Sequence, residues 1–498
     1  MIPIEGRRVE LSDWASTVLG LSKRPGWRYG HMTARRDADD SRLLEVLLLH
    51  PPSGSAEIVA ARIPQSECEF PSVTSGLPAA HWAERAVGDY WGLLAVGHPR
   101  WKSLILHQEL EVYEPPFAIP SDARTVRKES PFMTVAGEGV HEIPVGPIHA
   151  SIIEPGHFRF SCLGEIIANL EIRLGYQHRG IEARLAEIPW QRARHVIESA
   201  SSDSTVAYAL AHATAIENLL DIEVPRRAAA LRSLALEIER VANHVGDLGA
   251  LASDVGFALG AAVFGRLRGA ALGLGQTLSR TRFQKGFVCP GGVAWDVDGD
   301  TLGELAQSLA ALKPQVEEAC KLVFDNPGFE ERLEGVGVLN PSLASEFGLV
   351  GPAARASGSG YDARKHFEHG LYPAQPFGVV GPLAGDALSR AVVRRQELAG
   401  SWNLLEAVLA ALPDGTPSVL VPESLPASQV AIGIVEAWRG ELIHWVTTGP
   451  RGEIGRYSIR DPSFQNWTGV SIAVRNNLVA DFPLINKSFN LSYSGNDL

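Results

Sequence analysis

Apolar residues recur with a helical period over much of the chain. In residues 77–93, Trp82, Ala86, Tyr90 and Leu93 fall on one helix face, which is the spacing of an amphipathic helix. Longer helical patterns cover 198–222, 225–251, 255–281, 301–324 and 386–412. Several of these segments are apolar on more than one side, which is typical of helices buried in a bundle.

Strand-like segments lie on both sides of this helical region. Residues 42–50 and 56–64 predict two strands joined by the turn signal PPSGS. A second β segment is expected at about 141–173, and the sequence from residue 416 onward again has a mixed, strand-rich pattern. The predicted fold class is therefore α+β, with a helical-bundle core flanked by β elements.

The distribution of these elements predicts two domains. Residues 1–114 form a small α/β unit, and residues 141–498 contain the helical core. Residues 115–140 begin with a stretch rich in proline and charged side chains, which favours a linker. A chain of 498 residues also exceeds one ordinary hydrophobic core, so more than one domain is expected.

Charge and hydropathy exclude several classes of function. The formal net charge of −12 argues against nucleic acid as a main partner, because phosphate binding needs a concentrated basic surface. No apolar run approaches the ~18–20 residues of a membrane span, and the N-terminus lacks the hydrophobic region of a signal peptide. We therefore expect a cytoplasmic protein with no transmembrane segment of its own, able to dock on a membrane complex.

The four cysteines, Cys68, Cys162, Cys289 and Cys320, stand far apart in the sequence. None belongs to a Cys-x-x-Cys pair, so neither a disulfide framework nor a thiolate metal site of the usual spacing is expected. Isolated cysteines of this kind are usually small buried hydrophobic residues.

A series of long motifs resembles one family of redox proteins. In chain order they are VGPIHASIIEPGHFRF (145–160), RLGYQHRGIEARL (173–185), HATAIENLLDIEVPRRAAALRSLALEIERVANHVGDLGAL (212–251), GPAARASGSGYDARKH (351–366) and EAWRGELIHW (436–445). They resemble the large subunit of energy-converting, formate-hydrogenlyase-type nickel–iron hydrogenases and, equally, the quinone-pocket subunit of respiratory complex I. The segment FPSVTSGLPAAHWAERAVGDYWGLLAVGHPRW (70–101) resembles the small hydrophilic subunit of complex I. The implied fold is that of a hydrogenase large subunit with this small subunit fused at its N-terminus.

The resemblance implies where a nickel–iron centre would be bound. In the hydrogenases, four thiolates from two Cys-x-x-Cys pairs hold it. Here the first pair falls on Ser201 and Ser204 of ESASSDS, and the second on Ser492 and Gly495. A serine hydroxyl is hard and stays protonated near neutrality, whereas this chemistry favours soft sulfur. We therefore expect a family member that lacks the nickel–iron centre and binds no metal.

The resemblance also concerns quinone reduction. The complex I pocket pairs a histidine from a β loop with a tyrosine, and His157 or His149 is the counterpart of that histidine. The tyrosine falls about where Ser202 stands, while Tyr208 lies nearly two turns further along a helix. The usual quinone pair is therefore broken, and atypical quinone binding stays open.

Polar residues near these positions are the candidates for the site chemistry. Asp203, if buried among the serine hydroxyls, is a candidate proton carrier, with His157 and His149 as further candidate catalytic residues. Glu237, Glu239 and His244 lie on one long predicted helix, where they serve either an interhelical or solvated face or a buried proton relay.

Three further residues are candidates for binding a neighbouring group. His178 and Arg179 match a family segment near the iron–sulfur subunit, where an arginine could donate hydrogen bonds toward a cluster. The alternative for Arg179 is a structural salt bridge with Glu182, three residues on. Arg355 matches an arginine-bearing family loop, for which pocket lining and subunit contact both stay open.

The resemblance implies a subunit of a membrane-associated oxidoreductase complex that couples electron transfer to ion translocation. Its partners would be an iron–sulfur small subunit, which holds its own cluster, and integral membrane subunits at the inner face of the cell membrane. The chain itself would bind no cofactor, with quinone as the one exception left open. Two alternatives remain: a non-catalytic scaffold of that complex, or a quinone-reducing complex I-type subunit with the NAD-linked activity of its family. NAD binding by this chain is not expected, because it has no dinucleotide-binding glycine motif.

Overall fold

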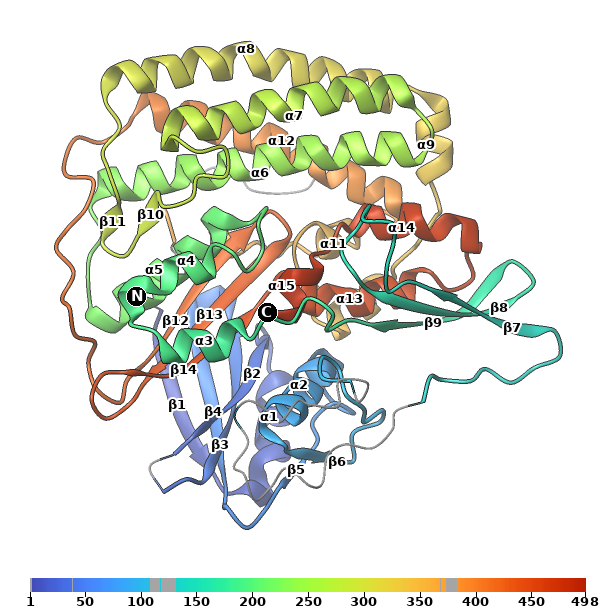
Figure 1. The fold of residues 1–498 in the computed structure, drawn as a ribbon, viewed down its shortest axis with the longest axis vertical. Helices are drawn as coiled ribbons and strands as arrows, with labels where there is room; N and C mark the ends of the chain where they lie inside the picture. Colours follow the sequence, from blue (N-terminus) through green and yellow to red (C-terminus); the bar gives the residue numbers. More distant parts are fainter. Residues whose placement is uncertain (1, 38, 108–116, 118–130, 368, 373–382) are drawn as a thin grey trace.

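The computed structural model describes residues 2–37, 39–107, 117, 131–367, 369–372 and 383–498. Figure 1 shows a layer of long helices at one end of the molecule, a central sheet below it, and the N-terminal unit at the other end. A third sheet projects to one side. None of the helices formed by these residues combines the length and the apolar character needed to cross a membrane.

The N-terminal unit is built on a four-stranded sheet with the order β1-β4-β3-β2. The strand β3 is the apolar run RLLEVLLLH, and it is buried over almost its whole length between two antiparallel neighbours, as befits a central strand. The elements are β1 (Ile4–Val9), α1 (Trp14–Ser22), β2 (Arg28–Arg36), β3 (Arg42–His50), β4 (Ser55–Ile63), β5 (Glu69–Pro71), α2 (His81–Trp91) and β6 (Leu94–Val96).

The projecting sheet is antiparallel and consists of β7 (Val140–Val145), β8 (His157–Leu163) and β9 (Ile166–Arg173). Phe158 and Phe160 of β8 are fully buried, and each packs on Phe482, with ring centroids 4.9 and 4.8 Å apart. These aromatic contacts attach the sheet to the C-terminal helices, which also shape the candidate site.

The helical layer consists of α6 (Arg226–Asp254), α7 (Ala258–Ser279), α8 (Gly299–Phe324) and α12 (Ala387–Ala410). The largest hydrophobic cluster lies here and reaches down to the central sheet. Small residues let α6 and α7 approach closely: a Cβ at Gly249 would lie 2.7 Å from the Cβ of Phe264. The helix α6 is buried along most of its length, so its polar side chains must find partners inside the protein.

The central antiparallel sheet contains β12 (Val430–Ala437), β13 (Gly440–Thr448) and β14 (Ile454–Arg460). The helix α5 (Thr205–Leu220) packs on β12 and β13. It comes so close that a Cβ at Gly433 would lie 2.0 Å from the carbonyl oxygen of Ala211. Strand β2 of the N-terminal unit contacts β14. There the Nε2 atom of His31 lies 2.9 Å from the hydroxyl oxygen of Ser458. The sheet is thus enclosed by both halves of the chain.

Shorter elements complete the fold. They are α3 (Ile181–Glu187), α4 (Ala193–Ile197), β10 (Val288–Cys289), β11 (Gly292–Val293), α9 (Pro327–Leu333), α10 (Pro341–Glu346), α11 (Gly351–Ala356), α13 (Pro462–Ala473), α14 (Phe482–Phe489) and α15 (Tyr493–Asp497).

The predicted α+β class is confirmed, and two local predictions are corrected. The helix expected over 198–222 begins only at Thr205, because the serine- and aspartate-rich stretch before it forms turns, as these side chains favour. The tail is strand-rich only as far as Arg460. Asp461 then caps α13 and Pro462 occupies its first position, which is a helix-start signal. The predicted linker 115–140 lies mostly outside the described residues, since only residues 117 and 131–140 of it are described.

Candidate functional site

Two segments that are 291 residues apart in sequence meet beside the N-terminus of α5. The hydroxyl oxygens of Ser201 and Ser492 lie 3.2 Å apart, and both residues are buried. The backbone N–H of Gly495 donates to the Ser492 hydroxyl at 2.8 Å. Ser204 joins through Asp203, its hydroxyl lying 3.5 Å from the carboxylate. All four positions implied for metal ligands therefore converge, and we name Ser201, Asp203, Ser204 and Ser492 the serine–aspartate cluster.

Local hydrogen bonds fix both sides of this cluster. The turn before α5 is closed by the N–H of Ser204, which donates to the carbonyl of Ser201 at 3.0 Å. On the other side, the Ser492 hydroxyl caps the short helix α15. The side chains of residues 178 and 179 each bind one of these two segments.

Arg179 donates to the carbonyls of Ser199 and Ala200 at 2.9 and 2.8 Å. His178 places Nδ1 at 2.7 Å from the carbonyl of Asp497. Both predicted residues thus lie at the edge of the site. The alternative salt bridge between Arg179 and Glu182 is wrong, because Glu182 binds Arg456 instead.

Arg439, in the turn between β12 and β13, binds Asp203. Its two terminal nitrogens donate to the two carboxylate oxygens at 2.7 Å each. Burial acts to raise the pKa of Asp203, but the Arg439 guanidinium and the Ser201 hydroxyl outweigh it, so the pKa lies below its ordinary value. The side chain also keeps 32% of its surface exposed. Asp203 is therefore a stable carboxylate near neutral pH, with a guanidinium as its counter-ion in addition to the surrounding hydroxyls.

A second carboxyl group, Glu239 of α6, has the opposite character. It is only 7% exposed, and it accepts hydrogen bonds from the N–H groups of Val206 and Ala207 in the first turn of α5, at 2.6 and 3.2 Å. Burial outweighs these two bonds and raises the pKa of Glu239 to about 8. Glu239 therefore holds its proton near neutral pH.

A small cavity connects these carboxyl groups with the surface. It has a volume of about 20 Å³, and its lining includes Asp203, Glu239 and Asn243 as well as the exposed residues Arg268 and Arg282. A space of this size holds about one water molecule. Asn243 also donates to the backbone carbonyl of Asp203 at 2.8 Å, so the cavity borders directly on the cluster.

Tyr208 and Asp461 form the buried floor of the site. The Tyr208 hydroxyl donates to Asp461 at 2.6 Å, and both residues are at most 1% exposed. The second oxygen of Asp461 accepts the N–H of Ser463 at 2.6 Å. Burial is the largest influence on Asp461 and raises its pKa above the ordinary value. Asp461 also fills the space beside Gly495, where an added Cβ would lie 2.6 Å from its carboxylate oxygen.

His149 and His157 lie on the loop between β7 and β8 and at the start of β8. His149 Nε2 lies 2.7 Å from the Gly156 carbonyl, and His157 Nδ1 lies 3.2 Å from the Gly146 carbonyl. The same loop reaches the site through Glu154, which accepts the N–H groups of Tyr493 and Ser494 at 3.1 and 3.3 Å. The histidines are thus bound to their own loop, while Tyr208 binds Asp461.

Arg355 belongs to a separate network of buried ions. It donates to Glu397 at 2.7 Å and to Glu436 at 2.8 Å, and His244 lies 2.7 Å from the other oxygen of Glu397. Burial acts to raise the pKa of Glu397, but Arg355 and His244 hold it below its ordinary value. Arg355 and His244 therefore join α6, α11, α12 and β12 rather than line the serine–aspartate cluster.

The site also contains residues that the sequence did not single out for it. Arg439 lies inside the motif EAWRGELIHW (436–445), and Asp461 lies further along the chain in RDPSF (460–464). An arginine in a tight turn and an aspartate before proline were visible signals. The sequence did not reveal their contact with residues 201–204, because both residues lie far from this segment along the chain. Only the path of β12–β14 brings them together.

The donor set at the converging positions does not fit a metal bound by thiolates. Three hydroxyls and one glycine stand there, and the four cysteines lie near β5 and on β8, β10 and α8. Within the described part of the chain, no group of three or more His, Cys, Asp and Glu side chains could hold a metal ion. Because a hydroxyl group both donates and accepts hydrogen bonds, hydroxyls in these surroundings are suited to binding water and exchanging protons.

Comparisons with known proteins agree with the two halves of the fold. Residues 8–118 match the family described as the respiratory-chain NADH dehydrogenase 30 kDa subunit, and residues 254–429 match that of the 49 kDa subunit. Both matched ranges exclude residues 201–204 and 492–495.

Relatives that match most of the chain extend this similarity. The chain is 32% identical to formate hydrogenlyase subunit 5 of Escherichia coli over 88% of this chain and 79% of the relative. It is 32% identical to hydrogenase-4 component G of the same organism, over 88% and 78%. It is also 29% identical to an NADH-quinone oxidoreductase subunit of Chlorobium chlorochromatii, over 76% and 96%.

A solved structure shows the same fold. One chain of the membrane-bound sulfane sulfur reductase, an archaeal respiratory membrane complex, superposes with a TM-score of 0.68 at 26% identity. The superposition covers 73% of this chain and all of that chain.

Proposed function

This chain belongs to the family of formate hydrogenlyase and hydrogenase-4 large subunits, fused from domains like the NADH dehydrogenase 30 and 49 kDa subunits, and we propose that it exchanges protons without a nickel–iron centre. Its setting is a membrane-bound respiratory complex related to hydrogenases and complex I.

The convergence of Ser201, Ser204, Ser492 and Gly495 on one site is the observation that carries this proposal. A nickel–iron centre would need thiolates at these positions, and a serine hydroxyl keeps its proton where a cysteine would lose one. Gly495 offers no side-chain donor at all, and Asp461 occupies the space of its missing side chain. No reaction step on this chain therefore runs through such a centre.

Proton exchange is supported by two carboxyl groups with opposite properties. Glu239 holds a proton near neutral pH, whereas Asp203 stays charged beside Arg439. Groups with a pKa close to the working pH transfer protons most effectively. The small cavity next to both groups gives them access to water and to the exposed face of α7. We therefore assign the proton-carrying role to Glu239, and to Asp203 the role of a fixed negative charge.

The proposal includes partners and a location. The similar archaeal chain is part of a respiratory membrane complex, which supports an iron–sulfur small subunit and integral membrane subunits as partners at the inner face of the membrane. His178 and Arg179 would then position the cluster-side wall of the site through the carbonyls that they bind. The iron–sulfur cluster belongs to the neighbouring subunit, and this chain needs no cofactor of its own.

The complex purified from its native membrane tests the proposal. We expect no nickel in it, and we expect Glu239→Gln to reduce redox-linked proton translocation at least tenfold, because the amide cannot carry a proton. Glu304→Gln, an exposed position on α8, is the matched control and should behave as wild type. Asp203→Asn should also impair translocation, since it removes the charge opposite Arg439.

Other results would assign a different role. Stoichiometric nickel, or full translocation in Glu239→Gln, contradicts the proposal. Tightly bound quinone lost on Tyr208→Phe would favour a quinone-reducing subunit. If translocation is unchanged in both Glu239→Gln and Asp203→Asn, and neither nickel nor quinone is bound, the chain would be a non-catalytic scaffold of the complex.

A further inference from the structure

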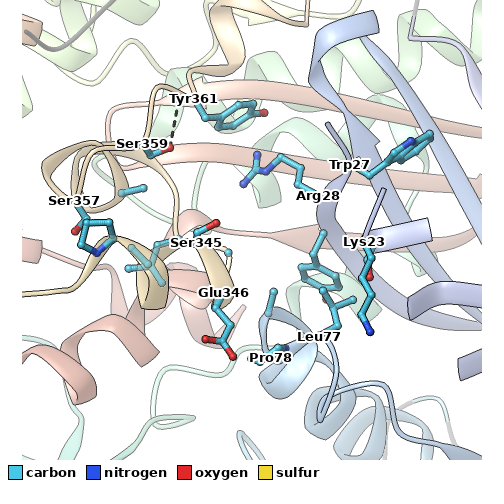
Figure 2. A pocket seen from close by; sticks show the side chains of 18 of the residues that line it. Lys23, Trp27, Arg28, Leu77, Pro78, Ser345, Glu346, Ser357, Ser359 and Tyr361 are labelled. Carbon is cyan, nitrogen blue, oxygen red and sulfur yellow. Dashed lines mark hydrogen bonds between the residues drawn. The ribbon is translucent and has the colours of Figure 1, made fainter. Parts of the chain in front are cut away.

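A pocket of about 480 Å³ lies between the two halves of the chain, away from the serine–aspartate cluster (Figure 2). One wall comes from the connection between α1 and β2, with Lys23 and Trp27, and from Arg28 at the start of β2, and the facing wall comes from residues 341–361. A cavity of this volume lies within the range of small-molecule sites. A molecule bound there would touch both halves at once.

Arg28 supplies positive charge at the back of this pocket. Its guanidinium lies 3.9 Å from the centre of the Tyr361 ring and donates to Glu441 at 3.0 Å. Glu441 also binds the fully buried Arg460 and the Tyr361 hydroxyl. Two guanidinium groups thus share the Glu441 carboxylate, and the nearby Glu436 carboxylate also stabilises the charged form of Arg28.

The orientation of Arg28 makes this charge available to a ligand. Figure 2 shows the side chain pointing across the pocket toward the wall that carries Tyr361 and Ser345. A guanidinium has five N–H donors, and 20% of the Arg28 side chain is exposed, whereas that of Arg460 is not exposed at all. Arginine with free donors is the preferred protein group for carboxylate and phosphate.

The charges at the mouth are more balanced. Lys23 is exposed, and no ion pair of it occurs among the described residues. Glu346 lies on the opposite wall, and both side chains point toward the same end in Figure 2. Because Glu346 repels anions at the mouth and Arg28 attracts them deeper inside, the anionic part of a ligand is expected at the Arg28 end.

The remaining lining is suited to an uncharged, flat group. Trp27, Leu77 and Pro78 offer apolar surface, while Ser357 and Ser359 place hydroxyl groups on the facing wall. Sites that combine apolar surface with a few oriented polar groups are typical of organic ligands.

We propose that this interdomain pocket binds a small organic anion that carries a planar ring, with the phosphate or carboxylate at Arg28 and the ring on the apolar surface that Leu77 and Pro78 contribute. Binding ties the N-terminal unit to the larger C-terminal domain. The pocket is independent of the proton exchange proposed above, so either proposal can fail without the other.

Ligand-dependent melting and calorimetry of the full chain test this inference. Adenosine 5′-monophosphate serves as the probe that combines anion and ring, adenosine supplies the ring alone, and inorganic phosphate the anion alone. We expect saturable binding of the monophosphate, with each partial probe at least about tenfold weaker, because one charged hydrogen bond is worth about that factor.

Two variants and a control separate the pocket from binding elsewhere. Lys23→Ala should weaken binding several-fold, and Arg28→Lys about tenfold or more, because lysine cannot form the bidentate contact. Lys321→Ala, an exposed lysine on α8, should leave binding unchanged. If Arg28→Lys does not fold, Lys23→Ala and Ser359→Ala decide. Absence of monophosphate binding, equal binding of adenosine, or unchanged binding in the pocket variants would overturn the proposal.

Discussion

Each terminal nitrogen of Arg439 lies 2.7 Å from one oxygen of Asp203. The pair joins the turn between β12 and β13 to the segment before α5, and Arg439 reaches on to the carbonyl of Asn490 at 2.6 Å. One guanidinium therefore holds three parts of the chain around the serine–aspartate cluster.

Replacing this guanidinium should destabilise the protein. We expect Arg439→Gln to lower the free energy of unfolding by about 3 kcal/mol, because a largely buried arginine is lost and its partner is left without a counter-ion. Denaturant unfolding of the full chain measures this. Arg451→Gln, at a side chain that is 88% exposed, should change the free energy by less than about 0.5 kcal/mol. Equal effects of the two substitutions would show that the Arg439–Asp203 pair contributes nothing specific.

Glu239 should make stability depend on pH. Its pKa of about 8 in the folded protein lies above the ordinary value of 4.5, so the folded state binds one more proton than the unfolded state between these values. The free energy of unfolding should therefore fall as the pH rises through this window, by at most about 1.4 kcal/mol per pH unit from this group.

The substitution Glu239→Gln should flatten that slope, whereas Glu304→Gln should not. Infrared spectroscopy of the full chain gives a second readout, since wild type should show a carboxylic acid band at neutral pH that Glu239→Gln lacks. If the free energies of unfolding of wild type and Glu239→Gln differ by the same amount at every pH, Glu239 does not titrate in this range.

Gly495 should not tolerate a side chain. A Cβ there would lie 2.6 Å from an oxygen of Asp461 and 3.0 Å from the Ser492 hydroxyl, so Gly495→Ala should cost about 1–3 kcal/mol of unfolding free energy. Gly303→Ala on α8, where nothing lies within 4 Å of the new Cβ, should instead be neutral or stabilising by up to about 1 kcal/mol. Thermal or denaturant unfolding of both variants decides. A neutral Gly495→Ala would mean that Asp461 moves freely and that the site has room for a larger group.

The Tyr208 hydroxyl should stabilise the charged form of Asp461. In Tyr208→Phe the buried carboxyl loses its 2.6 Å donor, so its pKa should rise further above the ordinary value, and stability should fall by about 1–3 kcal/mol. The rise in the pKa of Asp461 should appear as a larger infrared signal of the protonated carboxyl group in Tyr208→Phe than in the double variant Tyr208→Phe/Asp461→Asn. A larger signal that remains in the double variant would belong to another residue.

Local patterns predicted the long helices and the first hairpin well, because their apolar periods are determined by burial on one or more faces. The helices α6, α8 and α12 and the strands β3 and β4 lie within a few residues of the predicted ranges. The helical pattern extends back to residue 198 because the segment 198–204 adjoins a strongly periodic helix, but the polar side chains of this segment favour turns instead. The helices after Asp461 were missed since their start signal lies inside a stretch that continues the strand pattern.

For the site, sequence resemblance identified which positions come together but not which charges surround them. The contact of Ser201 with Ser492 was implied by the aligned motifs. The partner of Asp203 was not, because Arg439 lies 236 residues away and reaches the cluster only through the hairpin of β12 and β13. We therefore propose Glu239 rather than Asp203 as the proton carrier, because the structure raises the pKa of Glu239 and lowers that of Asp203.

Crystals of the native complex offer the most direct test, through anomalous X-ray scattering recorded on both sides of the nickel absorption edge. We expect no nickel signal between the turn at Ser201 and the start of α15. A nickel peak within bonding distance of Ser201, Ser204 or Ser492 would contradict it.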